Sequence, residues 1–458
     1  MSIDKISSII ESQRVFFASG QSKDIAFRKN ALRRLKLAIK TNEAEIIEAL
    51  YLDLGKSSFE SYASEIGLVL HEISNHIRHI RSWNATKRKA SSLSVYPSKS
   101  YIRQEPYGIC LIMAPWNYPF GLLMTPLVGA ISAGNCAVLK PANYSSNTTK
   151  VIEKIIGEAF SDEYISVFSG GRDVNAALLK ERFDYIFFTG GPVLGKIVAD
   201  VAAKNFTPLT LELGGKSPCI VDKDAHLKKA AKRIVWGKFL NLGQTCIAPD
   251  HLYVHKSIKE DLLKYLVKEL KAQFGENPSS SCDLGHLINA KAFERLSSYL
   301  ENADIISGGG ADRAKLFIEP TLINAKNDGS PVMSEEIFGP ILPIIEYENI
   351  NDLMEMQFKK EKPLAMYYFT TSNKKAKIMM DQVDSGGVCI NDVVIQFVNS
   401  KIPFGGSGNS GMGSYHGKFS FDAFSRQRGM IKSSNLIDIP IKFAPYKNKL
   451  PILKQILK

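Results

Sequence analysis

One of the six cysteines lies in a local sequence that differs from that of a buried structural thiol. Cys246 stands in GQTCIAPD, a run of small and polar residues that begins at Gly243 and ends at Pro249-Asp250. Cys110, by contrast, lies in the apolar run GICLIM. An accessible thiol becomes a strong nucleophile once it loses its proton. We therefore expect Cys246 to be the accessible thiol among the six, although composition alone also allows a cysteine with no chemical role.

Two further polar residues stand where a strand is expected to end. Glu212 closes TPLTLEL and is followed by two glycines, so it can act as a general base or as a partner in a structural ion pair. Asn117 lies between two prolines in PWNYP, directly after a buried strand. Its side-chain amide can donate to a developing oxyanion, or it can close an Asx turn.

Glycine-rich turns suggest a phosphate site. FFTGGPVLGK places Gly190, Gly191 and Gly195 between a strand and a helix, where a backbone can approach a pyrophosphate. The run is not G-x-G-x-x-G, so, taken alone, it favours a tight strand–helix turn over a phosphate site. Lys140, at the end of CAVLKP, is either a ribose or phosphate ligand or a solvated lysine.

The elements that must position these residues alternate between short strands and helices, which predicts parallel sheets in an α/β fold. Dinucleotides bind at the carboxyl ends of such strands. The first unit has expected strands at 108–115, 136–140, 164–168, 184–189 and 207–213, with helices at 121–133, 146–160 and 195–204. The second has strands at 217–221, 252–255, 342–346, 364–370 and 387–391, with helices at 226–241 and 256–274.

The remaining segments frame these two units. Apolar spacing predicts helices over 27–52 and 60–83, a polar stretch follows at 85–92, and residues 93–103 alternate like a strand exposed on one face. The tail 429–458 has no compact pattern of its own. A chain of 458 residues accommodates two or three domains.

Composition narrows the classes of partner. The net charge of +12 suits an anionic ligand, nucleic acid or a membrane surface, but the charges are spread along the chain, which favours a solvated basic surface. No nucleic-acid signature and no apolar run of membrane-spanning length is present. The cysteines form no C-x-x-C pair, so we expect neither a metal site nor a disulfide framework. The absence of a signal-peptide core and the scattered cysteines predict a reducing, cytoplasmic location.

Seven of these motifs occur in one order: PWNYP, GN-x4-KP, FTGG-x3-G, LELGGK, GQTC, EEIFGP and PFGGSGNSG. Together they resemble the aldehyde dehydrogenase superfamily over most of the chain. PFGGSGNSGMGSYHGKFSFDAFS is most similar to the class 3 branch, whose members are dimeric. The resemblance implies a Rossmann-type cofactor domain (1–84 and 104–211), an α/β catalytic domain (212–420), and a small β oligomerisation arm with bridging segments (85–103 and 421–458).

The resemblance also implies a role for each matched residue. Cys246 corresponds to the nucleophile, Glu212 to the general base and Asn117 to the oxyanion-hole amide. The positions that correspond to cofactor ligands are Lys140, Gly190, Gly191, Gly195, Glu336 and Phe338. The positions that correspond to the substrate tunnel are Tyr118, Phe397 and Phe404, whose aromatic rings suggest medium-chain aliphatic or aromatic aldehydes.

Two departures from the family pattern concern the cofactor, which the resemblance gives as NAD or NADP. Asn143 stands where the family often has a glutamate that bonds the ribose hydroxyls, and without that carboxylate we expect NADP to be tolerated. Gly191 stands where a serine is common, which lowers the hydrogen-bonding capacity of the turn. The basic tail KFAPYKNKLPILKQILK lacks the long apolar anchor of membrane-bound class 3 members, so we expect no stable anchor, although its short basic-apolar end can touch a membrane surface.

Three rival functions remain at this point. An acylating dehydrogenase passes its thioester to coenzyme A, and such enzymes commonly lack the glutamate that is present here as Glu212. A cysteine esterase needs a histidine partner, which none of the matched motifs supplies. A binding protein that has lost catalysis is disfavoured because Cys246, Glu212 and Asn117 are all present.

Overall fold

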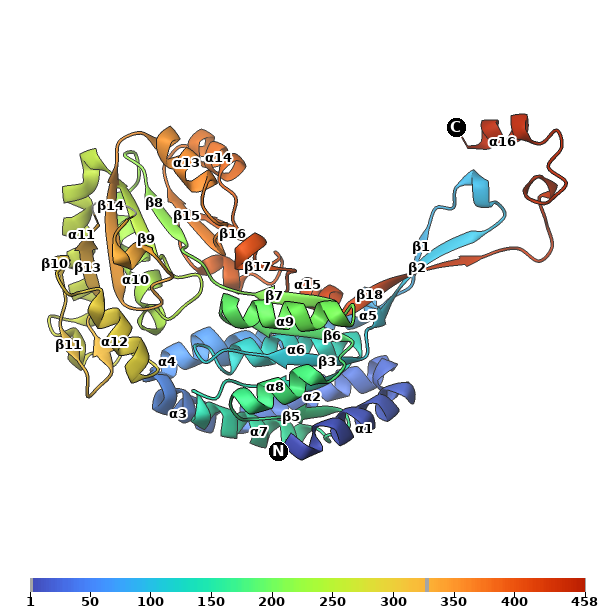
Figure 1. Ribbon diagram of the computed structural model, residues 1–458, viewed down its shortest axis with the longest axis horizontal. Helices are drawn as coiled ribbons and strands as arrows, with labels where there is room; N and C mark the ends of the chain where they lie inside the picture. The colour runs from blue at the N-terminus through green and yellow to red at the C-terminus, as the bar shows by residue number, and fades with distance from the viewer. Residues whose placement is uncertain (1–2, 326–328, 458) are drawn as a thin grey trace.

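The computed structural model describes residues 3–325 and 329–457, which form two α/β lobes and a projecting arm (Figure 1). The first lobe contains a six-stranded sheet in the order β17-β7-β6-β3-β4-β5. Its strands are β3 (Ile109–Met113), β4 (Cys136–Lys140), β5 (Ile165–Val167), β6 (Tyr185–Thr189), β7 (Leu209–Glu212) and β17 (Gly411–Met412). All pairs are parallel except that of β17 with β7. Strands β3, β4 and β6 are buried along their whole length because helices cover both faces of the sheet.

The helices of the first lobe come mostly from the first half of the chain. They are α1 (Ile6–Ala18), α2 (Ile25–Thr41), α3 (Glu43–Leu54), α4 (Ser58–Ser61), α5 (Gly67–Trp83), α6 (Gly121–Ala133), α7 (Ser146–Ala159), α8 (Arg172–Lys180) and α9 (Pro192–Lys204). The helical structure expected over 27–52 is present, and it is divided at Asn42 into α2 and α3. The Asn42 amide donates to the Ala38 carbonyl at 2.9 Å and to Glu158 at 2.8 Å, and such local bonds compete with helix continuation.

The second lobe contains a seven-stranded sheet in the order β10-β13-β14-β9-β8-β15-β16, in which only β10 runs antiparallel. Its strands are β8 (Pro218–Val221), β9 (His251–His255), β10 (Asp304–Ser307), β13 (Thr321–Asn324), β14 (Ile341–Tyr347), β15 (Ala365–Phe369) and β16 (Gly387–Ile390), with the separate pair β11 (Ala311–Asp312) and β12 (Phe317–Ile318). Its helices are α10 (Leu227–Phe239), α11 (Lys259–Phe274), α12 (Ala290–Ser298), α13 (Ile350–Phe358) and α14 (Asn373–Gln382). The two successive α/β units expected from the sequence are thus both present.

After the second sheet the chain returns to the first lobe. Strand β17 pairs with β7, with Gly411 opposite Glu212. Helix α15 (Lys418–Ala423) packs against α6. The segment 404–423 therefore lies beside the end of β7, where both lobes meet.

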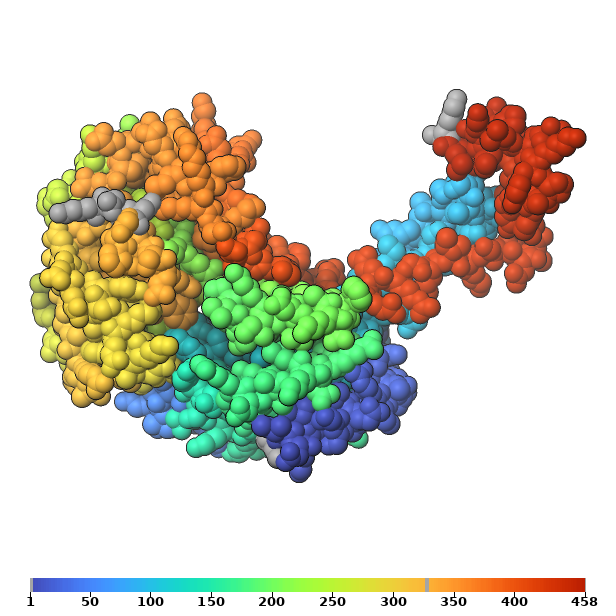
Figure 2. Space-filling view, viewed as in Figure 1, coloured from blue at the N-terminus to red at the C-terminus, as the bar shows by residue number. Residues whose placement is uncertain are grey.

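The arm is a three-stranded antiparallel sheet that projects away from both lobes (Figures 1 and 2). It consists of β1 (Lys87–Lys89), β2 (Lys99–Pro106) and β18 (Ser425–Lys432), and the last segment ends in α16 (Leu450–Ile456). The strand expected over 93–103 begins later, because Leu93–Val95 forms a 3-10 turn. Strand β1 lies within the stretch expected to be merely polar, and β18 extends into the tail, since main-chain pairing requires no apolar pattern.

No helix in residues 3–325 and 329–457 is both long enough and apolar enough to cross a membrane.

Candidate active site

Cys246 follows a tight loop at the junction of the lobes. Asn241, Leu242 and Gly243 all have positive φ angles of 51°, 52° and 76°. A Cβ at residue 243 would collide with the carbonyl oxygen of Gly339, so only glycine lets these two loops approach so closely. The Cys246 side chain is half-buried, whereas Cys282 is exposed. The expectation that Cys246 is the most accessible of the six thiols was therefore wrong, and what distinguishes it is the cavity beside it.

Asn117 connects the loop after β3 to the loop that carries Cys246. Its Nδ2 donates to the carbonyl oxygen of Gln244 at 3.0 Å, and its own carbonyl oxygen accepts from Asn241 Nδ2 at 2.8 Å. An amide nitrogen has two N–H groups. One of them is engaged with Gln244, which leaves the other, as far as the described residues go, to donate to a ligand.

A buried ion pair stands behind the Asn117 loop. Lys56 and Glu65 have side chains that are 0% exposed and 2.6 Å apart. Lys56 also donates to the Asn117 carbonyl at 2.8 Å, and Glu65 accepts the backbone N–H groups of Phe120 and Gly121, each at 2.9 Å. The last two contacts place a carboxylate at the start of α6, where the helix dipole favours negative charge. The sequence analysis did not single out Lys56 or Glu65, which lie in the helical region with no chemical motif around them.

Glu212 ends β7 and is only 2% exposed. Neither of its carboxyl oxygens has a hydrogen-bond partner among the residues that the structure describes. Burial without a partner raises the pKa of Glu212 well above its usual range. Burial is the main cause of the raised pKa of the Cys246 thiol, and the carboxyl groups of Glu336 and Glu212 raise it further. Both carboxyl groups therefore lie near the sulfur.

Glu336 occupies space left by a glycine of LELGGK. A Cβ at residue 214 would collide with the Glu336 carboxyl group. Burial, with a contribution from Asp250, raises the pKa of Glu336 to about 8. The next residue but one, Phe338, has a φ of 51° and its ring lies edge-on to Trp116 at 5.5 Å between centroids.

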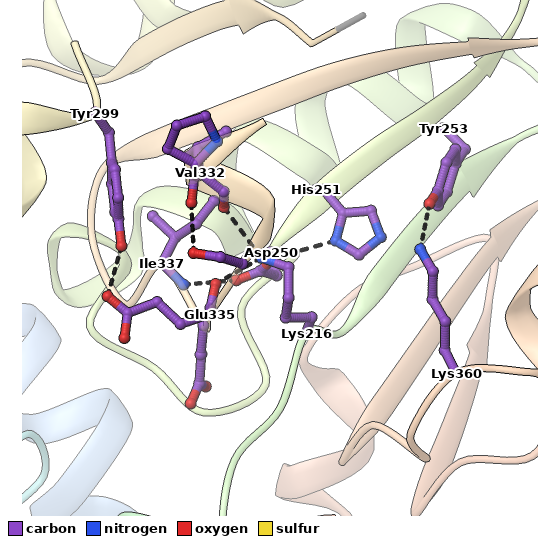
Figure 3. Close-up of polar contacts among 12 residues, drawn as sticks. Lys216, Asp250, His251, Tyr253, Tyr299, Val332, Glu335, Ile337 and Lys360 are labelled. Carbon is purple, nitrogen blue, oxygen red and sulfur yellow. Dashed lines mark hydrogen bonds and ion pairs between the residues drawn. The ribbon is translucent and has the colours of Figure 1, made fainter. Parts of the chain in front are cut away.

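A second polar network holds the EEIFGP loop (Figure 3). Asp250 accepts from Lys216 at 2.6 Å and from the backbone N–H of Ile337 at 2.9 Å, and its other neighbour is His251 at 3.1 Å. Lys216 also donates to the carbonyl oxygen of Glu335 at 2.7 Å. These contacts tie LELGGK, the end of GQTCIAPD and EEIFGP together, and they hold the pKa of Asp250 well below its usual range.

The expected cofactor residues lie at the carboxyl edge of the first sheet. Gly190 and Gly191 follow β6, and Gly195 is buried against Leu213 in the first turn of α9. Gly191 precedes that helix without a side-chain cap, and nothing lies within 4 Å of where its Cβ would stand. This open helix N-terminus is suited to a phosphate group.

Lys140, at the end of β4, is buried and donates to the carbonyl oxygen of Pro141 at 2.7 Å. Burial lowers the pKa of Lys140 to about 8. Among the described residues, no group of three or more histidine, cysteine or acidic side chains is arranged to hold a metal ion.

A cavity of about 390 Å³ opens beside Cys246. Its wall is mostly apolar and includes Tyr118, Leu122, Trp236, Phe239, Ile247 and Phe397. Tyr118 is held by a 2.6 Å hydrogen bond between its hydroxyl and that of Thr245. Of the three residues expected to line the substrate tunnel, Tyr118 and Phe397 line this cavity. Phe404 is not part of this wall but packs behind Phe397, with ring centroids 5.0 Å apart.

Comparisons with known proteins identify the family to which a chain with this fold and this site belongs. Residues 3–429 match the model of the aldehyde dehydrogenase family. The chain belongs to this family. Members of the family oxidise aldehydes to carboxylic acids, and the expected family, α/β fold class and enzyme class are all confirmed.

Relatives and solved structures cover nearly the whole chain. The 4,4'-diaponeurosporen-aldehyde dehydrogenase of Staphylococcus aureus is 44% identical over 447 residues, which is 97% of each chain. Aldehyde dehydrogenase family 3 member A2 of Macaca fascicularis is 41% identical over 93% of this chain and 88% of its own. The substrate-bound structure of Staphylococcus aureus AldH superimposes with a TM-score of 0.97 at 44% identity, covering 99% of both chains. The indole-3-acetaldehyde dehydrogenase AldA of P. syringae, solved with NAD+ and IAA, has a TM-score of 0.86 at 25% identity, covering 94% of this chain and 89% of that one.

Proposed function

We propose that this aldehyde dehydrogenase oxidises medium-chain aliphatic or aromatic aldehydes to the acid with NAD or NADP, through a thioester on Cys246. The observation that carries the proposal is the juxtaposition at the cavity. The Cys246 thiol forms part of an apolar wall, and the buried, unpaired carboxyl group of Glu212 lies near its sulfur.

The first step is attack by the sulfur of Cys246 on the carbonyl carbon. The resting group is the thiol, because burial and two nearby carboxyl groups raise its pKa. The proton of the thiol passes to the carboxylate of Glu212, which releases it to solvent before the later hydrolysis, and the backbone N–H groups of Cys246 and Ile247 favour the thiolate that forms. As the S–C bond forms, the carbonyl electrons move to oxygen, and the free N–H of Asn117 stabilises that oxyanion. One such donor stabilises the transition state by about 3 kcal/mol.

The cofactor is proposed to lie between the open turn before α9 and the aromatic pair of Phe338 and Trp116. Gly190, Gly191 and Gly195 would hold the pyrophosphate, Lys140 and Glu336 the two riboses, and Phe338 would face the nicotinamide ring. The uncapped N–H groups at the start of α9 fit a phosphate. NAD+ or NADP+, when bound, accepts the aldehyde hydrogen as hydride. Asn143 is exposed and uncharged, so no carboxylate at this position repels a 2′-phosphate.

Hydrolysis of the thioester is assigned to Glu212. Its carboxylate takes a proton from water, the hydroxide adds to the thioester carbon, and the C–S bond breaks to release the acid and the Cys246 thiolate. A carboxylate with a raised pKa is a stronger base than one in water. The presence of this base favours water over coenzyme A as the acceptor.

We further propose the domain organisation that the resemblance implies, with cofactor binding by 1–84 and 104–211 and catalysis by 212–420. The segments 85–103 and 421–458 would bridge two copies in a homodimer. The arm that they build projects away from the lobes and leaves strand β1 and most of β18 exposed (Figure 1). An exposed sheet edge is a surface for pairing.

Steady-state formation of reduced cofactor tests the proposal. The purified chain is assayed with a series of aliphatic and aromatic aldehydes, each with NAD+ and with NADP+, in the presence and absence of coenzyme A. We expect turnover with both cofactors and no acceleration by coenzyme A. Cys246→Ala should fold normally by circular dichroism and have no detectable turnover. Cys282→Ala, which removes an exposed thiol, should retain full activity. Turnover by Cys246→Ala would refute the assignment of the nucleophile.

A further inference from the structure

The wall of the cavity contains a carboxyl group that the reaction does not use. Glu60, in α4, lines the cavity and its side chain is only 7% exposed. Its Oε1 is buried and has no hydrogen-bond partner among the residues that the structure describes. Much of the wall around it is apolar, with Leu122, Trp236 and Phe239 among the residues that share it. An acidic oxygen left unpaired in such a wall is costly, so its position in the cavity calls for a functional explanation.

The charged groups that face Glu60 come from every element packed around it. Lys56 attracts its negative charge, but the Lys56 ammonium is already bonded to Glu65 and to the Asn117 carbonyl. Glu65 and Asp283 repel that charge, while the backbone N–H of Asn241 favours it. Tyr118 also faces Glu60, as the influence of the carboxyl group on the tyrosine hydroxyl indicates.

Burial outweighs these neighbours and raises the pKa of Glu60 to about 7. The protonated, neutral form therefore prevails below neutral pH, and the carboxylate prevails above it. A change of charge inside an apolar cavity strongly affects any other charge placed there, because little water screens it.

We propose that Glu60 makes the cavity selective for charge, so that it admits uncharged chains and disfavours carboxylates, including the acid that the enzyme forms. The inference rests on the proposed function, since it places an apolar aldehyde in this cavity. An aldehyde is uncharged and its binding is indifferent to Glu60. The product carries a carboxylate, and it is repelled once Glu60 ionises. The same repulsion excludes aldehydes that bear a second carboxylate.

Direct binding tests this inference without turnover. Isothermal titration calorimetry measures the Kd of decanoate and of its uncharged analogue decanamide at about pH 6 and about pH 8.5. The wild-type chain is compared with Glu60→Gln, which keeps the shape and removes the charge. The control is Glu48→Gln, which removes the same charge from an exposed position on α3 that does not line the cavity.

For the wild type we expect the Kd of decanoate to rise with pH, and that of decanamide to stay constant. At the higher pH, Glu60→Gln should bind decanoate about tenfold more tightly than the wild type, an effect of the size expected for two charges that share a poorly solvated cavity. Both variants should bind decanamide as the wild type does, which also verifies their folding, and Glu48→Gln should match the wild type with decanoate.

The outcomes separate the two proposals. If decanamide binds but Glu60→Gln has the same Kd for decanoate as the wild type at both pH values, the inference about Glu60 is wrong and the proposed function stands. If neither ligand binds to the wild type, the apolar substrate cavity itself is refuted, and the inference fails with it.

Discussion

The carboxylates behind the loops of the site and the carboxyl groups beside Cys246 and in the cavity wall lie in opposite environments. Behind the loops, Glu65 is bonded to Lys56 and to two backbone N–H groups, and Asp250 is bonded to Lys216 and to the N–H of Ile337. Near Cys246, Glu212 has no hydrogen-bond partner for either oxygen within the described ranges, and Glu60, in the cavity wall, has none for one oxygen.

The presence or absence of partners distinguishes carboxylates that fix the loops from carboxyl groups that can exchange a proton. A buried carboxylate with a cation and N–H donors stays ionised and fixes the backbone around it. A buried carboxyl group without them has a raised pKa and exchanges its proton within reach of neutral pH. The same residue type therefore holds the loops in one region and is free to accept a proton in the other.

The largest effect is expected from Glu212→Gln, which removes the unpaired base. Hydrolysis of the thioester should slow by about 10²–10⁴-fold, the usual contribution of a general base, while the first turnover still gives a burst of reduced cofactor. Stopped-flow absorbance separates the two phases. Full steady-state turnover by this variant would contradict the role of Glu212.

The pH dependence of thioester hydrolysis gives a second test of the role of Glu212. Because the pKa of Glu212 is raised, its carboxyl group is protonated at low pH and cannot accept a proton from water. Wild-type hydrolysis should therefore accelerate as pH rises, by about tenfold per unit below that pKa, and level off above it. In Glu212→Gln this dependence should be absent.

The next largest effect is expected on stability, from the buried ion pair of Lys56 and Glu65. Lys56→Met leaves Glu65 as an unpaired buried carboxylate, so the free energy of unfolding should fall by about 3–5 kcal/mol. Urea denaturation measures it. The Asn117 loop loses one of its anchors in this variant, so activity should decline as well.

A surface pair supplies the control for Lys56. Lys154 lies 2.5 Å from Glu45, but both side chains are about half exposed. Lys154→Met should therefore leave the denaturation midpoint close to that of the wild type, because water screens exposed pairs. Equal midpoints for the two variants would mean that Lys56 gives no special support.

The smallest effect is expected where a new carboxylate would be solvated. Asn143 is exposed, so Asn143→Glu adds an ionised group near the proposed ribose site. Repulsion of a 2′-phosphate should lower the ratio of kcat/KM for NADP to that for NAD by about tenfold. Asn143→Gln is the neutral control. A preference of the wild type for NAD of about a hundredfold would refute the expectation that NADP is tolerated.

Short motifs in the sequence pointed to the residues that we propose to react, but they did not reveal the residues that surround them. Cys246, Glu212 and Asn117 each stand in a short motif, and the structure brings all three to the junction of the lobes. Phe404 was expected in the tunnel but lies behind Phe397, since a motif does not specify which of two packed rings faces the cavity. Lys56, Glu65 and Glu60 went unnoticed, because acidic and basic residues within helical segments or in the short loops between them usually belong to a solvated surface.

The sequence alone determined the alternation of strands and helices, the glycine-rich turn between β6 and α9, and the family. These depend on local periodicity and on motifs that are contiguous along the chain. Only the tertiary structure decided which carboxyl groups are paired. Lys56 reaches Glu65 nine residues away, and Lys216 reaches Asp250 across the second lobe. Within the described ranges, by contrast, neither oxygen of Glu212 and only one oxygen of Glu60 has a hydrogen-bond partner. The pKa of an acid depends on what surrounds it in space, and neighbours in sequence do not reveal that environment.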